Sequence, residues 1–165
     1  MRSNHSKSVA LGGVLAAVAV VSMCLGGLIP IATYICPMIC IMTQFLVLHF
    51  CGRRLSWAWF VVVAFLSLLL GPDKEAAMVF CAVGYYPIIK QSIEKYRISV
   101  VLKFVFFNSS VLCCYGLMIY LLGMQEIIEE NAELGTIGLF FVLILGNLTF
   151  FLLDRLLAIL DRKLR

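Results

Sequence analysis

The sequence has few charged residues and almost no histidine. Lys, Arg, Asp and Glu make up 13% of its 165 residues, and only His5 and His49 carry an imidazole group. Soluble domains are about 25% charged, so a chain with this little charge and 63% apolar residues cannot cover itself with polar surface. A mean hydropathy of +1.06 therefore predicts an integral membrane protein. The net charge of +4 does not indicate nucleic-acid binding.

The sequence also lacks the motifs by which enzymes are recognised. Neither histidine has an acidic or histidine partner at a catalytic spacing, and nucleophile-elbow, zinc-protease and phosphate-loop patterns are absent. Seven cysteines lie inside or beside apolar segments, where they suit helix packing better than metal binding or a disulfide framework. We therefore expect a protein that is not an enzyme and has no cofactor and no metal site.

Apolar runs of about 20 residues, which match the thickness of a bilayer, occur six times. The first is too long for the apolar core of a cleaved signal and is interpreted as a span. Trp57 and Trp59 open the third span and suit the membrane interface, and Pro87 is expected to break or kink the fourth. The fold expected is an all-α membrane protein with six transmembrane helices in a single domain, residues 1–165. The expected spans are 9–29, 31–51, 55–71, 73–90, 99–123 and 135–153, followed by an amphipathic cytoplasmic tail, 154–165.

The basic residues are distributed unevenly between the two ends of these spans. Lys and Arg accumulate in cytoplasmic loops, so an alternating pattern fixes the orientation. The outer side carries one base, Lys74, and an acidic loop at 124–134. The pattern predicts a multi-pass protein of the cell membrane with both termini in the cytoplasm. The twelve bases of the inner side are Arg2, Lys7, Arg53, Arg54, Lys90, Lys95, Arg97, Lys103, Arg155, Arg162, Lys163 and Arg165.

Lys74 stands in a charged turn, Asp73-Lys74-Glu75, ahead of the fourth span. Helix capping explains both acids, because carboxylates stabilise the positive end of a helix. It does not explain Lys74. Two interpretations remain for this lysine: a contact for an anionic substrate, or a partner for an acid within the chain.

Two asparagines lie near the middle of the fifth and sixth spans. Burying an amide costs several kcal/mol unless it is hydrogen-bonded, so Asn108 and Asn147 need partners. They can face each other because the two spans are consecutive and antiparallel. Either they join the two helices, or they form the polar floor of a ligand cavity.

The first span carries two pairs of small residues at helical spacing, Gly12 with Ala16 and Gly13 with Ala17. Such pairs flatten one face of a helix so that another helix can approach closely. The face either packs within the chain or docks on another membrane subunit.

These features together resemble the substrate-binding S components of energy-coupling factor (ECF) vitamin transporters. The likeness covers the size and layout of the whole chain, the small-residue start of the first span, and the segments 72–77 and 84–90. It implies a six-helix bundle that binds a vitamin-like micronutrient near its outer side. It also implies docking on a transmembrane coupling subunit, which works with two ATPase subunits.

The resemblance assigns roles to two groups of residues. The docking residues are Gly12, Gly13, Ala16 and Ala17. The substrate-binding residues are Tyr34, Asp73, Lys74, Glu75, Asn108 and Asn147. The alternative is a scaffold of the cell-envelope machinery, similar to the rod-shape protein MreD, which binds proteins rather than solutes. An importer needs a cavity with convergent polar groups in its outer half, whereas a scaffold has packed apolar helices there.

Overall fold

The computed structural model describes the backbone of residues 2–26, 32–122 and 126–164. Side chains are described for residues 6–26, 35–114, 116, 117, 120 and 143–164. The chain divides into two compact units, an N-terminal unit of residues 1–97 and a C-terminal unit of residues 98–165. Each unit is described by itself.

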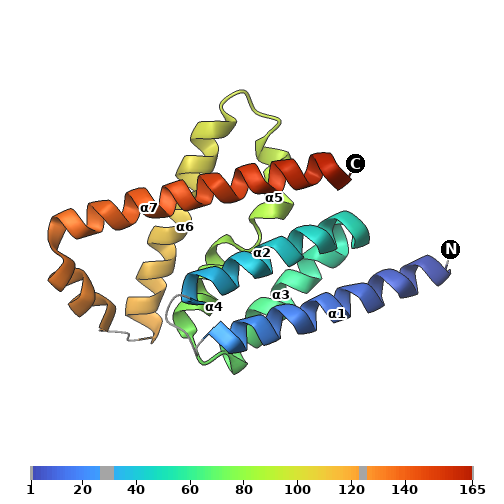
Figure 1. Cartoon of the computed structure of the whole chain (residues 1–165), viewed down its shortest axis with the longest axis horizontal. Helices are drawn as coiled ribbons and strands as arrows, with labels where there is room; N and C mark the ends of the chain where they lie inside the picture. The colour runs from blue at the N-terminus through green and yellow to red at the C-terminus, as the bar shows by residue number, and fades with distance from the viewer. Residues whose placement is uncertain (1, 27–31, 123–125, 165) are drawn as a thin grey trace. The chain divides into compact units, whose positions relative to one another are not determined.

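All regular structure in the described residues is helical. In the N-terminal unit, α1 (Arg2–Gly26), α2 (Ala32–Cys51) and α3 (Arg53–Leu70) lie side by side, as Figure 1 shows, and α4 (Lys74–Val83) and α5 (Tyr86–Ile93) follow. The C-terminal unit consists of α6 (Ser99–Leu122) and α7 (Glu126–Leu164). The expectation of an all-α protein is confirmed.

Among the described residues, four helical segments are long and apolar enough to cross a membrane, which fits a multi-pass membrane protein. They are Ser6–Gly26, Arg53–Leu70, Lys74–Ile93 and Leu143–Leu164. Ile35–Cys51 and Ser99–Cys114 are the apolar parts of α2 and α6 whose side chains are described, and each helix extends beyond them. These lengths and compositions support the first, third and fourth expected spans. The last segment covers residues 143–153 of the sixth expected span and continues into the expected tail, and the number six and the cytoplasmic termini stay predictions.

The last helix differs from the expectation of an outer loop over 124–134, while its continuation into the tail agrees with it. α7 begins at Glu126 and continues without interruption to Leu164. Two features explain this. Glutamates are good helix formers and favour the first turns of a helix, and no glycine or proline follows Gly146.

The fourth expected span is broken where the proline predicted it. α4 ends at Val83 and α5 begins at Tyr86, with Pro87 in its first turn. Pro87 has no amide hydrogen, so it cannot donate to the carbonyl of Val83. Gly84 lies in the break, where an added Cβ would be 2.5 Å from the Phe80 carbonyl oxygen and 2.7 Å from the Phe80 ring. Only glycine fits this close approach.

α2 is the central helix of the N-terminal unit and contacts α1, α3, α4 and α5. Its neighbours approach closely because their contact faces carry small residues, including Ala19 on α1 and Ala76 and Ala77 on α4, all of them buried. Larger side chains fill the space between the helices, among them the fully buried Phe80 and Tyr86. The core of this unit is therefore built around α2.

Side chains of α2 and α3 donate hydrogen bonds to the backbone of α1. The Cys40 thiol donates to the Ala19 carbonyl at 3.4 Å. The Trp59 indole nitrogen donates to the Gly12 carbonyl at 3.1 Å. Trp59 is only 5% exposed, so its ring packs inside the unit and does not face the lipid headgroups. Trp57 is 39% exposed and remains suited to the membrane interface.

An exchange of Gly84 for alanine tests the close approach at the break. We expect Gly84→Ala to destabilise the protein by about 1–3 kcal/mol, because the new methyl group collides with a fully buried phenylalanine. Thermal unfolding in detergent, followed by circular dichroism, measures the effect. Gly116→Ala on α6 is the matched control, since nothing in the described part of the chain lies within 4 Å of its added Cβ. Equal unfolding midpoints for the two variants would contradict the prediction.

Candidate functional site

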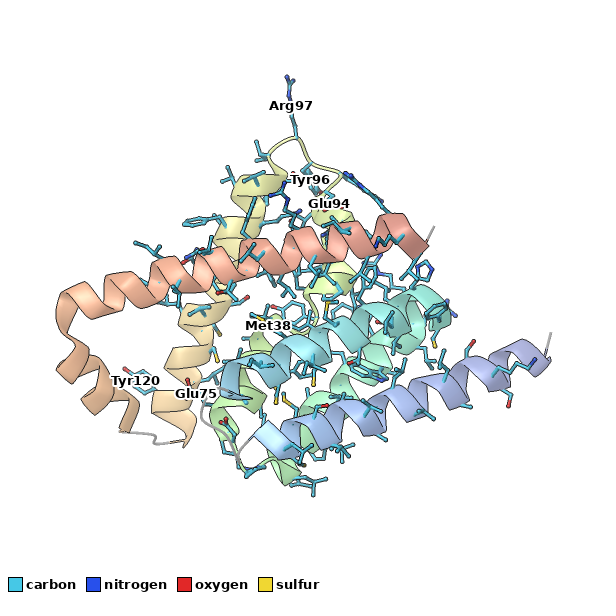
Figure 2. The ribbon with its side chains drawn as sticks, viewed as in Figure 1. Met38, Glu75, Glu94, Tyr96, Arg97 and Tyr120 are labelled. Atoms are coloured by element: carbon cyan, nitrogen blue, oxygen red, sulfur yellow. The ribbon has the colours of Figure 1, made fainter. Side chains whose placement is uncertain are left out.

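The turn between α3 and α4 brings together three of the predicted substrate-binding residues. Asp73 caps α4: its carboxylate accepts a hydrogen bond from the Ala76 amide at 3.0 Å. Glu75 is in the first turn of the same helix (Figure 2), where a carboxylate interacts favourably with the helix dipole. The capping predicted for Asp73 is thus observed in the structure.

Lys74 has a structural role that the sequence did not indicate. Its ammonium group donates to the carbonyl oxygens of Leu68, at 2.8 Å, and Gly71, at 2.9 Å. These carbonyls belong to the end of α3, which has no further turn to satisfy them. Lys74 thereby ties the end of one helix to the start of the next, and an ammonium group has one more hydrogen to donate.

The start of α4 lies close to the first part of α2. The two helices pack against each other, and the buried Cys36 is near enough to the Asp73 carboxylate to interact with it electrostatically. Tyr34 is in the first turn of α2, but its side chain lies outside the described residues. The structure therefore brings the backbone of this end of α2 and the Asp73–Glu75 turn to the same region.

Asn108 and Asn147 bind each other across α6 and α7. Each side-chain amide nitrogen donates to the other's amide oxygen, at 3.0 and 3.2 Å. Each also donates to a carbonyl one turn back in its own helix, Phe104 for Asn108 and Leu143 for Asn147, both at 2.9 Å. All four amide hydrogens are used in this way. The pairing favours the helix-joining interpretation over the floor of a cavity.

Two further contacts extend this seam between α6 and α7. The rings of Phe107 and Phe150 stack with centroids 4.6 Å apart. The Lys103 ammonium and the Asp154 carboxylate form an ion pair at 2.8 Å, and their side chains are 15% and 14% exposed. The sequence had placed Asp154 in the tail and missed this pair. The sequence did contain a signal for this pair, since Lys103 near the start of the fifth span and Asp154 just after the sixth lie at the same end of two antiparallel helices.

The small-residue strip on α1 divides into two faces. Gly12 is buried, and a Cβ added to it would be 3.4 Å from a methyl group of Leu55. Ala16 is half-buried. Gly13 and Ala17 are exposed, and no described residue lies within 4 Å of an added Cβ at Gly13. Packing within the chain therefore uses the first pair, and the second pair remains accessible.

Buried polar groups on α2 and α3 were missed by the sequence analysis. The Gln44 amide nitrogen donates to the backbone oxygen and the hydroxyl of Ser56, at 3.0 and 2.9 Å. The amide oxygen of Gln44 and the hydroxyl of Ser67 are buried without a hydrogen-bond partner in the described part of the chain. Gln44 could have been found by the rule that singled out the asparagines, since it lies well inside an apolar span.

Comparisons of the chain with protein-family models, with curated proteins and with solved structures find no match.

Replacing Asp73 separates its capping role from any role of its charge. We expect Asp73→Ala to lower the unfolding free energy by about 0.5–2 kcal/mol, because α4 loses its N-cap. Asp73→Asn should retain the stability, because asparagine caps equally well. Thermal unfolding in detergent compares the variants. Equal losses in both would show that the carboxylate charge, rather than the cap, is what the turn requires.

A double-mutant cycle tests the asparagine pair. We expect Asn108→Leu or Asn147→Leu alone to destabilise the protein by about 1 kcal/mol, because the remaining amide loses its partner. The double variant should lose less than the sum of the two, because no unpaired amide remains. Unfolding in detergent gives the coupling energy. Strictly additive losses would show that the two amides do not depend on each other.

Proposed function

We propose that this chain is a non-catalytic membrane subunit that docks on a partner membrane protein through α1, and that it serves as the substrate-binding S component of an ECF-type importer. The observation that carries the proposal is the accessible face of α1. Gly13 and Ala17 form a flat strip there, while Gly12 and Ala19 hold the helix to the rest of the unit from the other side. A small-residue strip of this kind lets a second helix approach closely.

The partners that follow from this proposal are the ECF transmembrane coupling subunit and its two ATPases. The substrate is a vitamin-like micronutrient that enters from outside the cell, with the termini of the chain in the cytoplasm. The turn of Asp73, Lys74 and Glu75 and the neighbouring start of α2, with Tyr34, supply the substrate contacts. The donor that Lys74 still has after capping α3 would serve an anionic group of the substrate.

A second candidate function is supported by a different observation. The groups predicted to bind substrate already bond within the chain: Lys74 to α3, and Asn108 to Asn147. Polar groups satisfied in this way stabilise a bundle without a ligand. This favours the MreD-like scaffold, which also docks on other membrane proteins but takes no solute.

Co-expression tests the docking strip. We expect the chain to co-purify with an ECF coupling subunit and its ATPases from the same cell, and we expect Gly13→Leu and Ala17→Leu to weaken this complex at least tenfold, because leucine holds the helices apart. Quantitative pull-down with a tagged coupling subunit measures the loss. The matched control is Ala58→Leu, which enlarges an exposed alanine on α3. Undiminished assembly of the double variant Gly13→Leu/Ala17→Leu would refute the docking role.

Mass spectrometry of small molecules that co-purify with the intact complex separates the two candidates. An importer subunit should retain a stoichiometric solute that is lost on Lys74→Met. A scaffold should retain none and should instead co-purify with envelope proteins.

A further inference from the structure

The end of the N-terminal unit that carries the α2–α3 turn is strongly basic. The turn is tight, since Gly52 has a φ of +84°, and it is followed directly by Arg53 and Arg54, both exposed. The Cys51 thiol donates to the Ser8 carbonyl at 3.2 Å, which brings the exposed Lys7 on α1 to the same end of the unit. Three cationic side chains from two segments of the chain therefore gather around this turn.

These cations have no carboxylate to neutralise them within the unit. The first 72 residues contain no Asp or Glu at all. Asp73 and Glu75 are at the far end of α3, roughly 26 Å from Arg53 at 1.5 Å per helical residue, well beyond the screening length of about 10 Å. The third acid of the unit, Glu94, pairs with Lys90 at 3.7 Å. Neither arginine forms an ion pair in the part of the chain that the structure describes.

The start of α3 adds to this positive charge. Its N-cap residue Gly52 provides no side-chain hydrogen bond, and no acidic residue stands in the first turn. The free amides and the helix dipole make this end positive, and two arginines beside it raise the potential further. Such an arrangement is unfavourable alone and is stabilised by an anion.

The surroundings of the turn indicate which anion it meets. α3 fits a membrane span by its length and composition, so its first residues reach the level of the lipid headgroups. Trp57, one turn further along, is 39% exposed and suits the same level of the bilayer.

We propose that Lys7, Arg53 and Arg54, with the uncapped start of α3, form a binding site for the phosphate of an anionic phospholipid headgroup. Arginine suits this role because its guanidinium group can hold a phosphate with two parallel hydrogen bonds. The site is independent of whether the chain is an importer subunit or a scaffold. The proposal goes beyond the general excess of basic residues expected on the cytoplasmic side, because it locates the preference for anionic lipid in one turn of the chain.

Quenching by brominated lipids can test this site directly. Trp57 is next to the proposed site, and the chain's other tryptophan, Trp59, is buried. The full chain is reconstituted in phosphatidylcholine that contains increasing amounts of brominated phosphatidylglycerol or, in parallel, brominated phosphatidylcholine. We expect brominated phosphatidylglycerol to quench the wild-type fluorescence at lower mole fractions than brominated phosphatidylcholine.

The variants locate the preference. Arg53→Gln/Arg54→Gln should weaken the relative affinity for phosphatidylglycerol roughly 20- to 30-fold, as expected for two bases near an anionic surface. Arg53→Lys/Arg54→Lys should retain most of it and shows that the turn tolerates substitution. The matched control Arg162→Gln/Lys163→Gln removes two exposed bases from α7 and should leave the preference unchanged.

Three results would overturn the proposal. The first is equal quenching of the wild type by the two brominated lipids. The second is an equal loss of preference in the α3 and α7 double variants, which would mean that only net charge matters. The third is reversal of the phosphatidylglycerol quenching by millimolar inorganic phosphate, which would assign the turn to a soluble anion.

Discussion

Polar groups among apolar helices must find hydrogen-bond partners inside the protein, because hydrocarbon offers none. In the N-terminal unit this constraint determines how α1 is held. Cys40, Cys51 and Trp59 all donate to carbonyl oxygens of α1. Those carbonyls are accessible because residues with small side chains, Ser8, Gly12 and Ala19, carry them. Gly13 and Ala17 take no part in these contacts and are exposed, so α1 uses one set of small residues for packing and leaves another accessible to a partner.

The C-terminal unit meets the constraint with side chains on both helices. From one end of the seam to the other, α6 and α7 are joined by the Lys103–Asp154 ion pair, the Phe107–Phe150 stack and the asparagine pair. Removing one partner of an ion pair with little solvent exposure strongly destabilises a protein, because the other charge is left buried and unpaired. The intact pair adds little net stability. The seam therefore fixes the register of the two helices more than it strengthens them.

The features that local rules govern could be predicted from the sequence. The Asp73 cap depends on the neighbouring residues alone, the break at Pro87 on a missing amide, and the asparagine pair on equal depth in consecutive spans. Lys74 could not be assigned, because its partners are carbonyls that only the chain reversal after α3 brings near. The burial of Trp59 was predictable in principle: residues 57 and 59 are two apart, so they point to opposite sides of a helix, and one of them had to face inward.

The same constraint bears on the choice between importer and scaffold. A group that binds substrate must have hydrogen-bonding capacity left when the site is empty. The asparagine pair has no donor left, and Lys74 has one. Within the described part of the N-terminal unit, the buried atoms that lack a partner are the Gln44 amide oxygen and the Ser67 hydroxyl. The Ser67 hydroxyl can donate or accept a hydrogen bond, but a solute bound beside Gln44 would have to donate one to α2, whereas a solute bound at the turn before α4 would have to accept one from Lys74. The balance of donors and acceptors on a co-purified ligand would therefore distinguish these two positions.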